Sequence, residues 1–391
     1  MKSEWKSRTL GEITSYIAKG IPPKYTEIEN NSTIHVLNQK CNRDFKISYD
    51  LSRLHDNGIK KVANEKMLQI GDVLINSTGT GTAGRVAQVF DIPFPTTYDG
   101  HMILLRPSDE IDTFYYGYAI KQWQTKIESL AEGSTGQTEI NRQRLCDEII
   151  ISFPADYQLQ KQISLLFYDI DRKISINTAI NENLEQQAQA IYAQMFIESA
   201  EESWKTESLS DIAVITMGQS PKGDTFNETG EGAVFYQGRT DFGFRFPTRR
   251  LYTTEPKRIA LCGDALMSVR APVGDLNVAY EDCCIGRGLA AIHSKDNHQS
   301  FVLYTLFTLK KQLDVFNGEG TVFGSINKKS LNSMEITIPP RELMDRFEST
   351  VSPIDRAIRN NYEEICRLQA IRDTLLPKLM NGEIDVSEVK I

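Results

Sequence analysis

An internal duplication constrains this 391-residue chain more than any other feature of its sequence. Ordered matches connect the two halves: Trp5-Lys6 with Trp204-Lys205, Pro22 with Pro221, Gly71-Asp72 with Gly263-Asp264, Ile140-Asn141 with Ile326-Asn327, and Ile170-Asp171-Arg172 with Ile354-Asp355-Arg356. The spacing between matched residues falls from 199 to 184 in small steps, as short loop deletions would produce. Repetition at a fixed period means that one structural unit has been copied, so we expect two similar domains.

Each copy begins with a segment of short apolar runs punctuated by Gly, Pro, Asn and Asp, which is typical of strands and turns. We expect strands at Asp72–Ile75, Val86–Phe90, Met102–Leu105, Ala265–Val269 and Leu289–Ile292. We expect helices at Phe114–Leu130 and Phe301–Phe316. Each copy then continues into a long helical pattern that follows a proline, Pro154 or Pro340. The predicted fold is α+β, with domains at 1–153 and 203–338 and helical segments at 154–202 and 339–391.

The two helical segments carry apolar residues at sustained seven-residue spacing, which is typical of a coiled coil. The predicted helix seam consists of Ile163, Ile170, Asn177, Leu184 and Ile191 in the first helix and Phe347, Ile354, Asn361, Leu368 and Leu375 in the second. A polar break falls at the middle of both series, at Asn177 and Asn361. If the helices pair antiparallel, a pseudo-twofold arrangement brings these asparagines face to face. The alternative is two separate surface helices, each with its own polar break.

Motifs of catalysis and cofactor binding are weak in this sequence. The run Gly79-Thr-Gly81-Thr-Ala-Gly84 matches the dinucleotide fingerprint, but that fingerprint must open a helix, and the residues from Arg85 to Phe90 favour a strand. We therefore expect a tight hairpin there, with nucleotide binding as the alternative. No hydrolase, metalloprotease or adenine-methyltransferase cassette is present, and the five histidines do not cluster with carboxylates. We expect no bound metal and no cofactor in this chain.

The six cysteines show no zinc-finger spacing, and a disulfide framework is not indicated, so we expect a reducing, cytoplasmic environment. No apolar run approaches the ~20 residues that span a bilayer, and we expect no membrane partner. The net charge of −8 argues against nucleic-acid binding when taken as a sum. Most of it lies in the helical segments, however: residues 151–202 carry −5 and residues 339–391 carry −2. The two globular segments are close to neutral and contain local basic clusters.

The clearest basic cluster runs from Arg239 to Arg258, and aromatic residues are interleaved among its cations. Arg and Lys side chains can bind phosphates and guanine, and Asn or Gln side chains can bind adenine, so both copies contain candidate DNA contacts. The predicted set is Gln237, Arg239, Arg245, Arg249, Arg250, Lys257 and Arg258 in the second copy, and Asn38, Gln39, Lys40, Arg43 and Lys46 in the first. The alternative is a solvated charged surface with its aromatic residues in the core.

The ordered pattern resembles the specificity (S) subunit of type I restriction–modification systems, over essentially the whole chain. The resemblance rests on the paired Trp-Lys-x-x-x-Leu-x-x-Ile openings at Trp5 and Trp204, the paired Gly71-Asp-Val-Leu-Ile75 and Gly263-Asp-Ala-Leu-Met267 segments, and the helical segments 186–196 and 375–384.

The resemblance implies two target recognition domains, each recognising one half of a bipartite, asymmetric site in double-stranded DNA. It implies that the two long helices form an antiparallel spacer that docks two modification subunits, which carry S-adenosylmethionine and methylate adenine. Restriction subunits join in systems that cleave. This chain would itself be non-catalytic. Two alternatives remain open: the recognition subunit of a type IIB-like restriction enzyme, and a scaffold of duplicated modules that binds proteins and no DNA.

Overall fold

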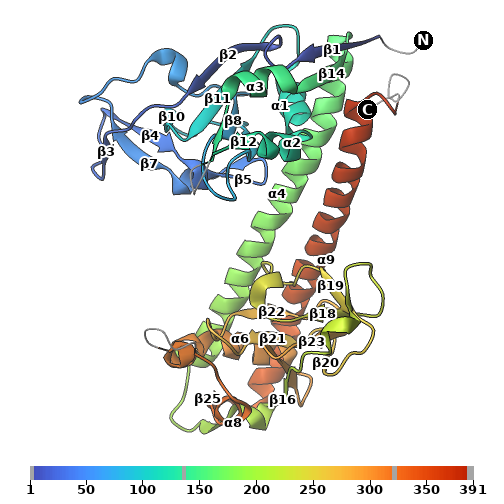
Figure 1. The fold of residues 1–391 in the computed structure, drawn as a ribbon. Helices are drawn as coiled ribbons and strands as arrows, with labels where there is room; N and C mark the ends of the chain where they lie inside the picture. The colour runs from blue at the N-terminus through green and yellow to red at the C-terminus, as the bar shows by residue number, and fades with distance from the viewer. Residues whose placement is uncertain (1–3, 134–137, 319–323, 385–391) are drawn as a thin grey trace. The chain divides into compact units, whose positions relative to one another are not determined.

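The computed structural model describes residues 4–133, 138–318 and 324–384. The chain divides into two compact units (Figure 1). Unit 1 comprises Met1–Ile176 and Glu364–Ile391, and unit 2 comprises Asn177–Glu363. The two long helices are α4 (Tyr157–Ala193) and α9 (Arg341–Met380). Each helix is divided between the two units, so that one part of it belongs to unit 1 and the other part to unit 2. The unit boundaries therefore fall within the helices, whereas the sequence placed domain boundaries near the helix ends. Of the predicted C-terminal segment, 385–391 lies outside the described residues.

Unit 1 contains two four-stranded sheets and a β1–β14 pair that leads into α4. The first sheet has the order β2-β11-β8-β9 and the second β10-β4-β7-β3, in which β10 and β4 are parallel. The strands are β1 (Trp5–Thr9), β2 (Thr14–Lys19), β3 (Tyr25–Thr26), β4 (Thr33–Leu37), β5 (Asn42–Arg43), β6 (Lys46–Ile47), β7 (Arg53–Asp56), β8 (Val73–Asn76), β9 (Val86–Gln88), β10 (Thr96–Tyr98), β11 (Met102–Pro107), β12 (Ala131–Glu132), β13 (Glu139–Ile140) and β14 (Ile150–Pro154).

Unit 2 repeats the two main sheets of unit 1 and its β1–β14 pair, whose counterpart is β15–β25. Its sheets have the orders β16-β24-β21-β22 and β17-β19-β18-β23-β20, and β18 and β23 form the parallel pair. Among the described residues, β20 has no counterpart in unit 1, and the short pairs β5–β6 and β12–β13 of unit 1 have none in unit 2. The strands are β15 (Lys205–Ser208), β16 (Ala213–Met217), β17 (Phe226–Asn227), β18 (Ala233–Tyr236), β19 (Leu251–Thr253), β20 (Ile259–Ala260), β21 (Ala265–Ser268), β22 (Leu276–Val278), β23 (Cys283–Ile285), β24 (Leu289–Ser294) and β25 (Glu335–Ile338). The duplication predicted from the sequence is thus a duplication of fold.

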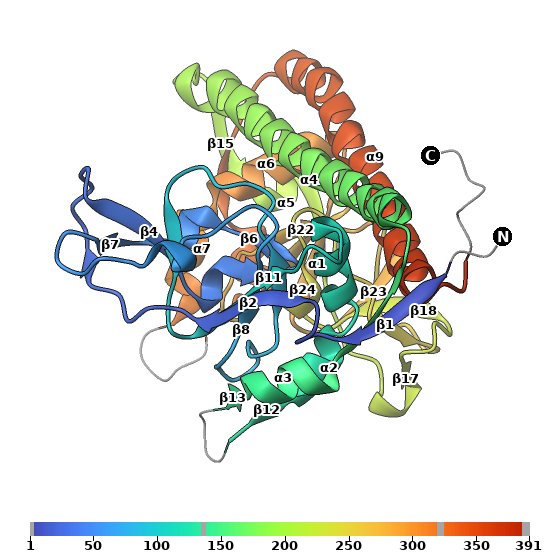
Figure 2. The same cartoon turned by 90° about the horizontal axis from the view of Figure 1, so that it is seen from above.

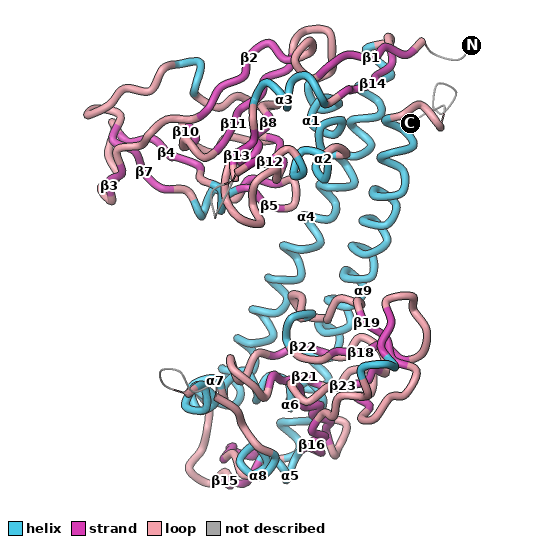
Figure 3. Tube along the Cα trace, viewed as in Figure 1, coloured by secondary structure: helices cyan, strands magenta, loops and turns pink. Residues whose placement is uncertain are grey.

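Short helices and loops connect these strands (Figure 3). In unit 1, α1 packs beside β14 and α3 beside β1 (Figure 2). The helices are α1 (Thr113–Lys121), α2 (Gln124–Ser129) and α3 (Arg142–Glu148) in unit 1, and α5 (Leu209–Ile212), α6 (Gln299–Thr308), α7 (Lys310–Asp314) and α8 (Lys328–Asn332) in unit 2. The short helical turns are η1 (Gln39–Cys41), η2 (Tyr49–Leu51), η3 (Asn64–Lys66), η4 (Gln194–Glu198), η5 (Gly223–Thr225), η6 (Arg239–Asp241) and η7 (Val315–Asn317). Each of the two predicted middle helices, Phe114–Leu130 and Phe301–Phe316, is therefore broken into shorter pieces.

The same close backbone crossing occurs in both units, and it requires glycine. The Ile21 N–H donates to the Tyr98 carbonyl at 3.0 Å in unit 1, and the Gln219 N–H donates to the Ile285 carbonyl at 2.9 Å in unit 2. A Cβ added to the preceding residue, Gly20, would lie 2.0 Å from the Asp99 carbonyl oxygen. A Cβ at Gly218 would meet the oxygen of Gly286 at 2.1 Å.

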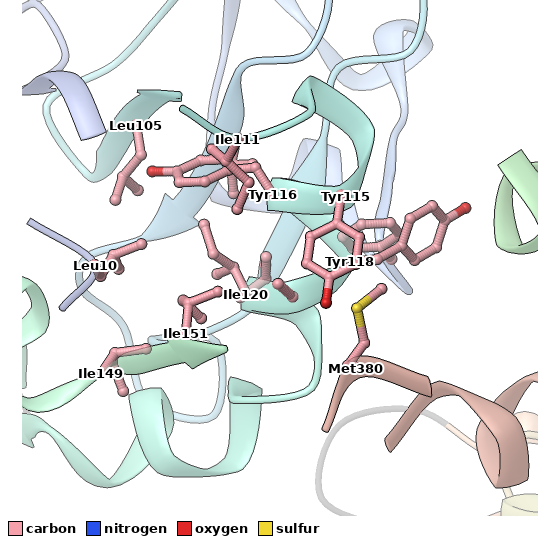
Figure 4. Packing of buried hydrophobic residues seen from close by; sticks show 14 of the residues in the cluster. Leu10, Leu105, Ile111, Tyr115, Tyr116, Tyr118, Ile120, Ile149, Ile151 and Met380 are labelled. Atoms are coloured by element: carbon pink, nitrogen blue, oxygen red, sulfur yellow. The ribbon is translucent and has the colours of Figure 1, made fainter. Parts of the chain in front are cut away.

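Each unit has its own apolar core, which includes its part of the long helices. In unit 1, Leu10 after β1 and buried side chains from β11, α1 and β14 pack with Met380 of α9 (Figure 4). In unit 2, Phe301 of α6 lies 5.1 Å from Phe196 and 5.8 Å from Tyr192 between ring centroids. These aromatic contacts fix the domain of unit 2 on the helix residues that belong to it.

The long helices pack together and run antiparallel within each unit. In unit 1, Asp171 of α4 pairs with Arg372 of α9 at 2.6 Å, and Lys173 pairs with the earlier residue Glu364 at 3.6 Å. In unit 2, the Asn181 amide donates to the Ile358 carbonyl at 3.1 Å. The predicted seam residues are all buried or half-buried. This agrees with the predicted α+β fold and its two packed helices.

The polar break in the seam contains a third asparagine. Asn177 is 2% exposed, and the Asn361 side chain donates to the Asn181 side chain at 2.9 Å. Asn181 lies one helical turn after Asn177, so the polar break in α4 extends over both residues. An amide pair of this kind satisfies both buried polar groups and helps to specify register.

The Gly79–Gly84 segment forms a hairpin turn between antiparallel strands β8 and β9, as predicted. Gly79, Gly81 and Gly84 all have positive φ angles, of 105°, 72° and 90°. A strand follows the turn, so the helix N-terminus that a dinucleotide fingerprint needs is not formed there. Within the described residues, no helix is long and apolar enough to cross a membrane.

Candidate nucleic-acid interface

The two predicted basic clusters begin at equivalent places in the two units. In unit 1, η1 follows strand β4, and in unit 2, η6 follows the corresponding strand β18. In both units this strand pairs in parallel with a later strand, β10 or β23. The loops that carry the clusters therefore leave the same edge of the same sheet. This equivalence supports the pairing of Lys40 with Arg239 made from the sequence.

Arg245 is a correction to the predicted DNA-binding set, because its side chain is buried. It is 4% exposed and pairs with Glu185 of α4 at 3.1 Å and with Asp355 of α9. Its guanidinium also donates to the Tyr304 hydroxyl at 3.1 Å. Burial raises the pKa of Glu185, and the charge of Arg245 opposes that shift. Arg245 therefore fixes its loop to the helices of unit 2 and presents no guanidinium to solvent.

Three other arginines of the second cluster are about half exposed, and each faces a carboxylate. Arg239 pairs with Asp275, Arg249 with Glu281 at 2.5 Å, and Arg250 with Asp241 at 2.8 Å. Lys257 is exposed and lies 3.9 Å from Glu255. Exposed ion pairs contribute only ~0–1 kcal/mol, so a phosphate can replace Asp275 or Glu281 at low cost. Asp241 is buried, so its pair with Arg250 costs more to break. Phe244, between these cations in the sequence, is 47% exposed and offers a ring for stacking.

Gln237 and Arg258, the remaining members of the second cluster, are exposed. The Gln237 carbonyl accepts a hydrogen bond from the Gly288 N–H, in the loop between β23 and β24. The Arg258 carbonyl accepts one from the Ile285 N–H, in β23. Within the described part of the chain, neither side chain has an assigned hydrogen bond. Both are therefore available for a ligand at the surface of unit 2.

The first cluster divides into structural amides and free cations. The Asn38 side chain accepts a hydrogen bond from the Lys40 N–H at 2.9 Å, and the Gln39 side chain donates to Thr78 at 2.5 and 2.6 Å. These amides hold the loop and are occupied. Lys40 and Arg43 are exposed. Lys46 lies elsewhere, beside α4, where burial lowers the pKa of its amine and Asp171 opposes that shift.

A cleft of about 560 Å³ in unit 2 contains two cations that the sequence analysis did not select. Arg270 follows β21 and Arg287 lies between β23 and β24; both are exposed and line this cleft with Met217 at the end of β16. In the described part of unit 2, neither arginine has a carboxylate partner. They are isolated in sequence, so a search for dense basic runs passes over them. In the folded unit the two arginines line one cleft and form a positive site on its loops.

The equivalent cleft of unit 1 has different chemistry. It measures about 650 Å³ and is lined by Lys19, Arg142, Glu132 and Glu139 among others. Lys19 pairs with Glu139, and Arg144 beside it pairs with Glu132. The isolated bridges Thr78–Glu139 and Arg270–Ser325 show that Thr78 stands where Arg270 stands in unit 2. The two units thus present different side chains on one shared framework.

The structure offers no metal-binding group within residues 4–133, 138–318 and 324–384, where no three His, Cys, Asp or Glu side chains gather at ligand spacing. The features that remain are two equivalent loop surfaces, each with exposed cations. Together they define a class: a recognition protein built from two copies of one domain.

The comparisons with known proteins give the family. Residues 2–186 and 201–365 each match the type I restriction modification DNA specificity domain. The chain belongs to this family and is a DNA specificity subunit of a type I restriction–modification system, the non-catalytic component of that enzyme. Two matched segments in tandem also agree with the duplicated fold.

Similar proteins cover nearly the whole chain. It is 30% identical over 408 residues to the putative type I restriction enzyme MjaX specificity subunit of Methanocaldococcus jannaschii, covering 98% of this chain and 94% of the relative. It is 22% identical over 469 residues to the type I restriction enzyme HindI specificity subunit of Haemophilus influenzae, covering 98% and 100%. A crystal structure of a type I restriction–modification S subunit from M. genitalium has the same fold, with a TM-score of 0.62, 18% identity and coverage of 97% and 96%.

Proposed function

We propose that this specificity subunit recognises a bipartite, asymmetric site in double-stranded DNA, with one half of the site assigned to each unit. The observation that carries the proposal is the combination of identical strand topology with different loop side chains. Lys40 and Thr78 in unit 1 correspond to Arg239 and Arg270 in unit 2. Two equal frameworks with unequal contact residues would recognise two different short sequences.

The proposed contact residues combine the exposed members of the predicted set with the two arginines of the unit 2 cleft. In unit 2 they are Gln237, Arg239, Arg249, Arg250, Lys257, Arg258, Arg270 and Arg287. In unit 1 they are Lys40 and Arg43. Arginine and lysine bind phosphates and the O6 and N7 atoms of guanine, so these side chains can position the duplex and select bases.

The helices α4 and α9 would dock two modification subunits that carry S-adenosylmethionine and methylate adenine. Apolar side chains support a protein partner, because Leu165, Ile176 and Ile180 of α4 and Ile371 of α9 are 39 to 47% exposed. The acidic character of the helical segments also favours protein over phosphate as their partner.

The experiment that tests this function is an exchange of domains within the assembled complex. Residues 1–153 are replaced by the corresponding residues of a homologous specificity subunit, and the methylated sequences are mapped. One half of the recognised site should change and the other half should stay. The reciprocal exchange of residues 203–338 is the matched control and should change the opposite half. A change in both halves, or in neither, contradicts the assignment of one half to each unit.

A further inference from the structure

Strand register identifies equivalent aromatic residues in the two units. Val73 of β8 pairs with Gln88, and Ala265 of β21 pairs with Val278, so the paired strands of the two hairpins correspond residue by residue, although their connecting loops differ in length. Two residues beyond the paired positions, Phe90 of unit 1 corresponds to Tyr280 of unit 2. The two side chains start from the same point of the fold, and their surroundings can be compared directly.

In unit 2, the chain fills the space beside Tyr280 with its own side chains. Phe246 is 4% exposed, and its ring lies 5.7 Å from Tyr280 and 4.9 Å from Tyr362 between centroids. These three rings form a closed cluster. Aromatic groups at such separations contribute packing beyond the burial of their surface, so this place is a favourable site for a ring.

The residue before Phe246 fixes the correspondence with unit 1. Arg245 lies with its guanidinium carbon 5.5 Å from the centre of the Tyr304 ring, and Phe45 lies 5.0 Å from Tyr118. These tyrosines are equivalent, because each donates a 2.9 Å hydrogen bond to an aspartate of the long helices, Asp355 or Asp171. Phe45 therefore corresponds to Arg245.

The next residue in unit 1 is Lys46, where unit 2 has Phe246. Lys46 is exposed over part of its length, its amine lies beside α4, and it brings no ring to this place. The Phe90 ring packs against Phe114 and Tyr168, at 5.5 and 5.4 Å between centroids. A cavity of about 240 Å³ remains at this place. It is lined by Asp44, Phe45, Lys46, Ile47, Gln88, Phe90, Asp91, Tyr168, Asp171, Arg172 and Ser175.

The cavity has the size and chemistry of a receptor for a ring. A cavity of roughly 150 Å³ suffices to hold benzene, so this one accommodates a phenyl or phenol group. Phe45, Phe90 and Tyr168 supply aromatic walls, and the ring centroids of Phe90 and Tyr168 lie 5.4 Å apart.

The surface beside the cavity favours a protein as the source of that ring. Arg172 of α4 lines the cavity, and on the same face of the helix lie Leu165, seven residues before it, and Ile176, four residues after it. These two side chains are 39% and 44% exposed. Residues at such spacing form one stripe of a helix. This face is mixed, with Asp169 and Arg172 between the two exposed apolar side chains. Exposed apolar and charged groups beside an aromatic pocket are typical of a protein interface with a buried anchor.

We propose that this cavity receives an aromatic side chain of a modification subunit and serves as an anchor point that unit 2 lacks, because Phe246 already fills the equivalent place. The proposal rests on the proposed function, since it assigns a docking residue to the expected partner. It implies that the two docking surfaces of the duplicated chain are chemically unequal. The subunit bound at unit 1 would gain a contact that the subunit at unit 2 does not have.

The test fills the cavity from inside the chain. The substitution Lys46→Phe introduces the side chain that unit 2 has, and binding of the cognate modification subunit to the full chain is measured by isothermal titration calorimetry. Loss of a buried aromatic anchor should weaken the tighter of the two binding events by about tenfold or more. Lys46→Ala, which removes the amine and leaves the cavity open, should bind within about twofold of the unsubstituted chain. Lys61→Phe adds the same ring at an exposed position and is the matched control for added hydrophobicity.

A second filling variant protects the test against misfolding. Ser175→Phe places a ring in the cavity from α4. The binding result of a filling variant, Lys46→Phe or Ser175→Phe, is used when its thermal midpoint equals or exceeds that of the unsubstituted chain. Undiminished binding by a stable filled variant overturns the anchor and leaves the proposed function intact. Failure of the unsubstituted chain to bind the modification subunit overturns the proposed function itself. Binding of p-cresol to the free chain, with no effect of filling on the subunit, assigns the cavity to a small molecule and also overturns the anchor.

Discussion

Replacing Arg245 with methionine should destabilise unit 2 strongly and leave the surface of its DNA-binding loops nearly unchanged. The side chain is 4% exposed and bonds Glu185 at 3.1 Å, Tyr304 at 3.1 Å and Asp355. Methionine retains much of the volume but removes the charge. Glu185 and Asp355 would remain as two largely buried carboxylates. Asp355 would keep hydrogen bonds from Ser300 and Tyr304, whereas Glu185 would lose the guanidinium that now pairs with it. Removing one partner of a buried ionic network costs about 3–5 kcal/mol.

Hydrogen exchange read by mass spectrometry measures this cost locally, which suits a chain of two units that need not unfold in one step. Amides of α6 and of residues 341–363 should exchange about two to three orders of magnitude faster in the variant, since each factor of ten corresponds to about 1.4 kcal/mol. Amides of unit 1 should change little. The matched control is Arg249→Met, because Arg249 and its partner Glu281 have side chains 50% and 36% exposed. Such a pair is worth less than about 1 kcal/mol.

The loss of stability caused by Arg245→Met should increase as the pH rises. Burial raises the pKa of Glu185, and removing Arg245 removes the charge that opposes this shift. The folded variant therefore holds a proton on this carboxyl more tightly than the unfolded chain does, and it loses stability as the pH rises. The deficit in thermal midpoint should be larger at pH 8 than at pH 5. A variant that keeps its stability and loses DNA binding would refute the buried role of Arg245.

Three further predictions concern single sites. Arg270→Ala and Arg287→Ala should each weaken DNA binding by the assembled complex and reduce its salt dependence by about one phosphate contact, as measured in binding titrations at several salt concentrations. Lys205→Ala on β15 is the control and should change neither quantity. If the arginine variants and the control have equal effects, the cleft is not part of the DNA interface. Burial lowers the pKa of Lys121 from 10.5 to about 8, so unit 1 should gain up to about 3 kcal/mol between pH 8 and pH 10.5, where the unfolded chain binds the extra proton. Lys121→Met should abolish this rise in thermal unfolding across that range. Gly20→Ala should cost about 2 kcal/mol or more because its Cβ would lie 2.0 Å from a carbonyl oxygen, whereas Gly223→Ala, with no atom within 4 Å, should change the thermal midpoint little.

The duplication could be predicted from the sequence because some of its matched residues are required by local turn geometry. Gly71 and Gly263 both adopt φ of 92°, a conformation that favours glycine. The aspartate that follows each glycine accepts a hydrogen bond from a backbone N–H three residues before it, at 2.7 Å for Asp72 and 2.8 Å for Asp264. Because these requirements are satisfied within four residues, the Gly-Asp pair survives in both copies. The hairpin at Gly79–Gly84 was predictable for the same reason.

The role of individual cations depends on distant residues and could not be predicted from local pattern. Arg245 and Arg249 stand four positions apart in one basic run, yet the first is buried against helix residues 60 and 110 positions away. Arg270 and Arg287 are isolated in sequence and meet only where two strand connections converge. The cavity beside Phe90 is bordered by Lys46, where unit 2 has a phenylalanine ring, and only the comparison of the two folded units reveals that difference.

Mapping of methyladenine in a host that expresses this chain with its modification subunit tests the central claim most directly. The account predicts one bipartite motif, in which two different specified segments are separated by a gap of fixed length with no base preference. Methylation at a single contiguous motif, or at two identical half-sites, would contradict the assignment of two unequal recognition units to this chain.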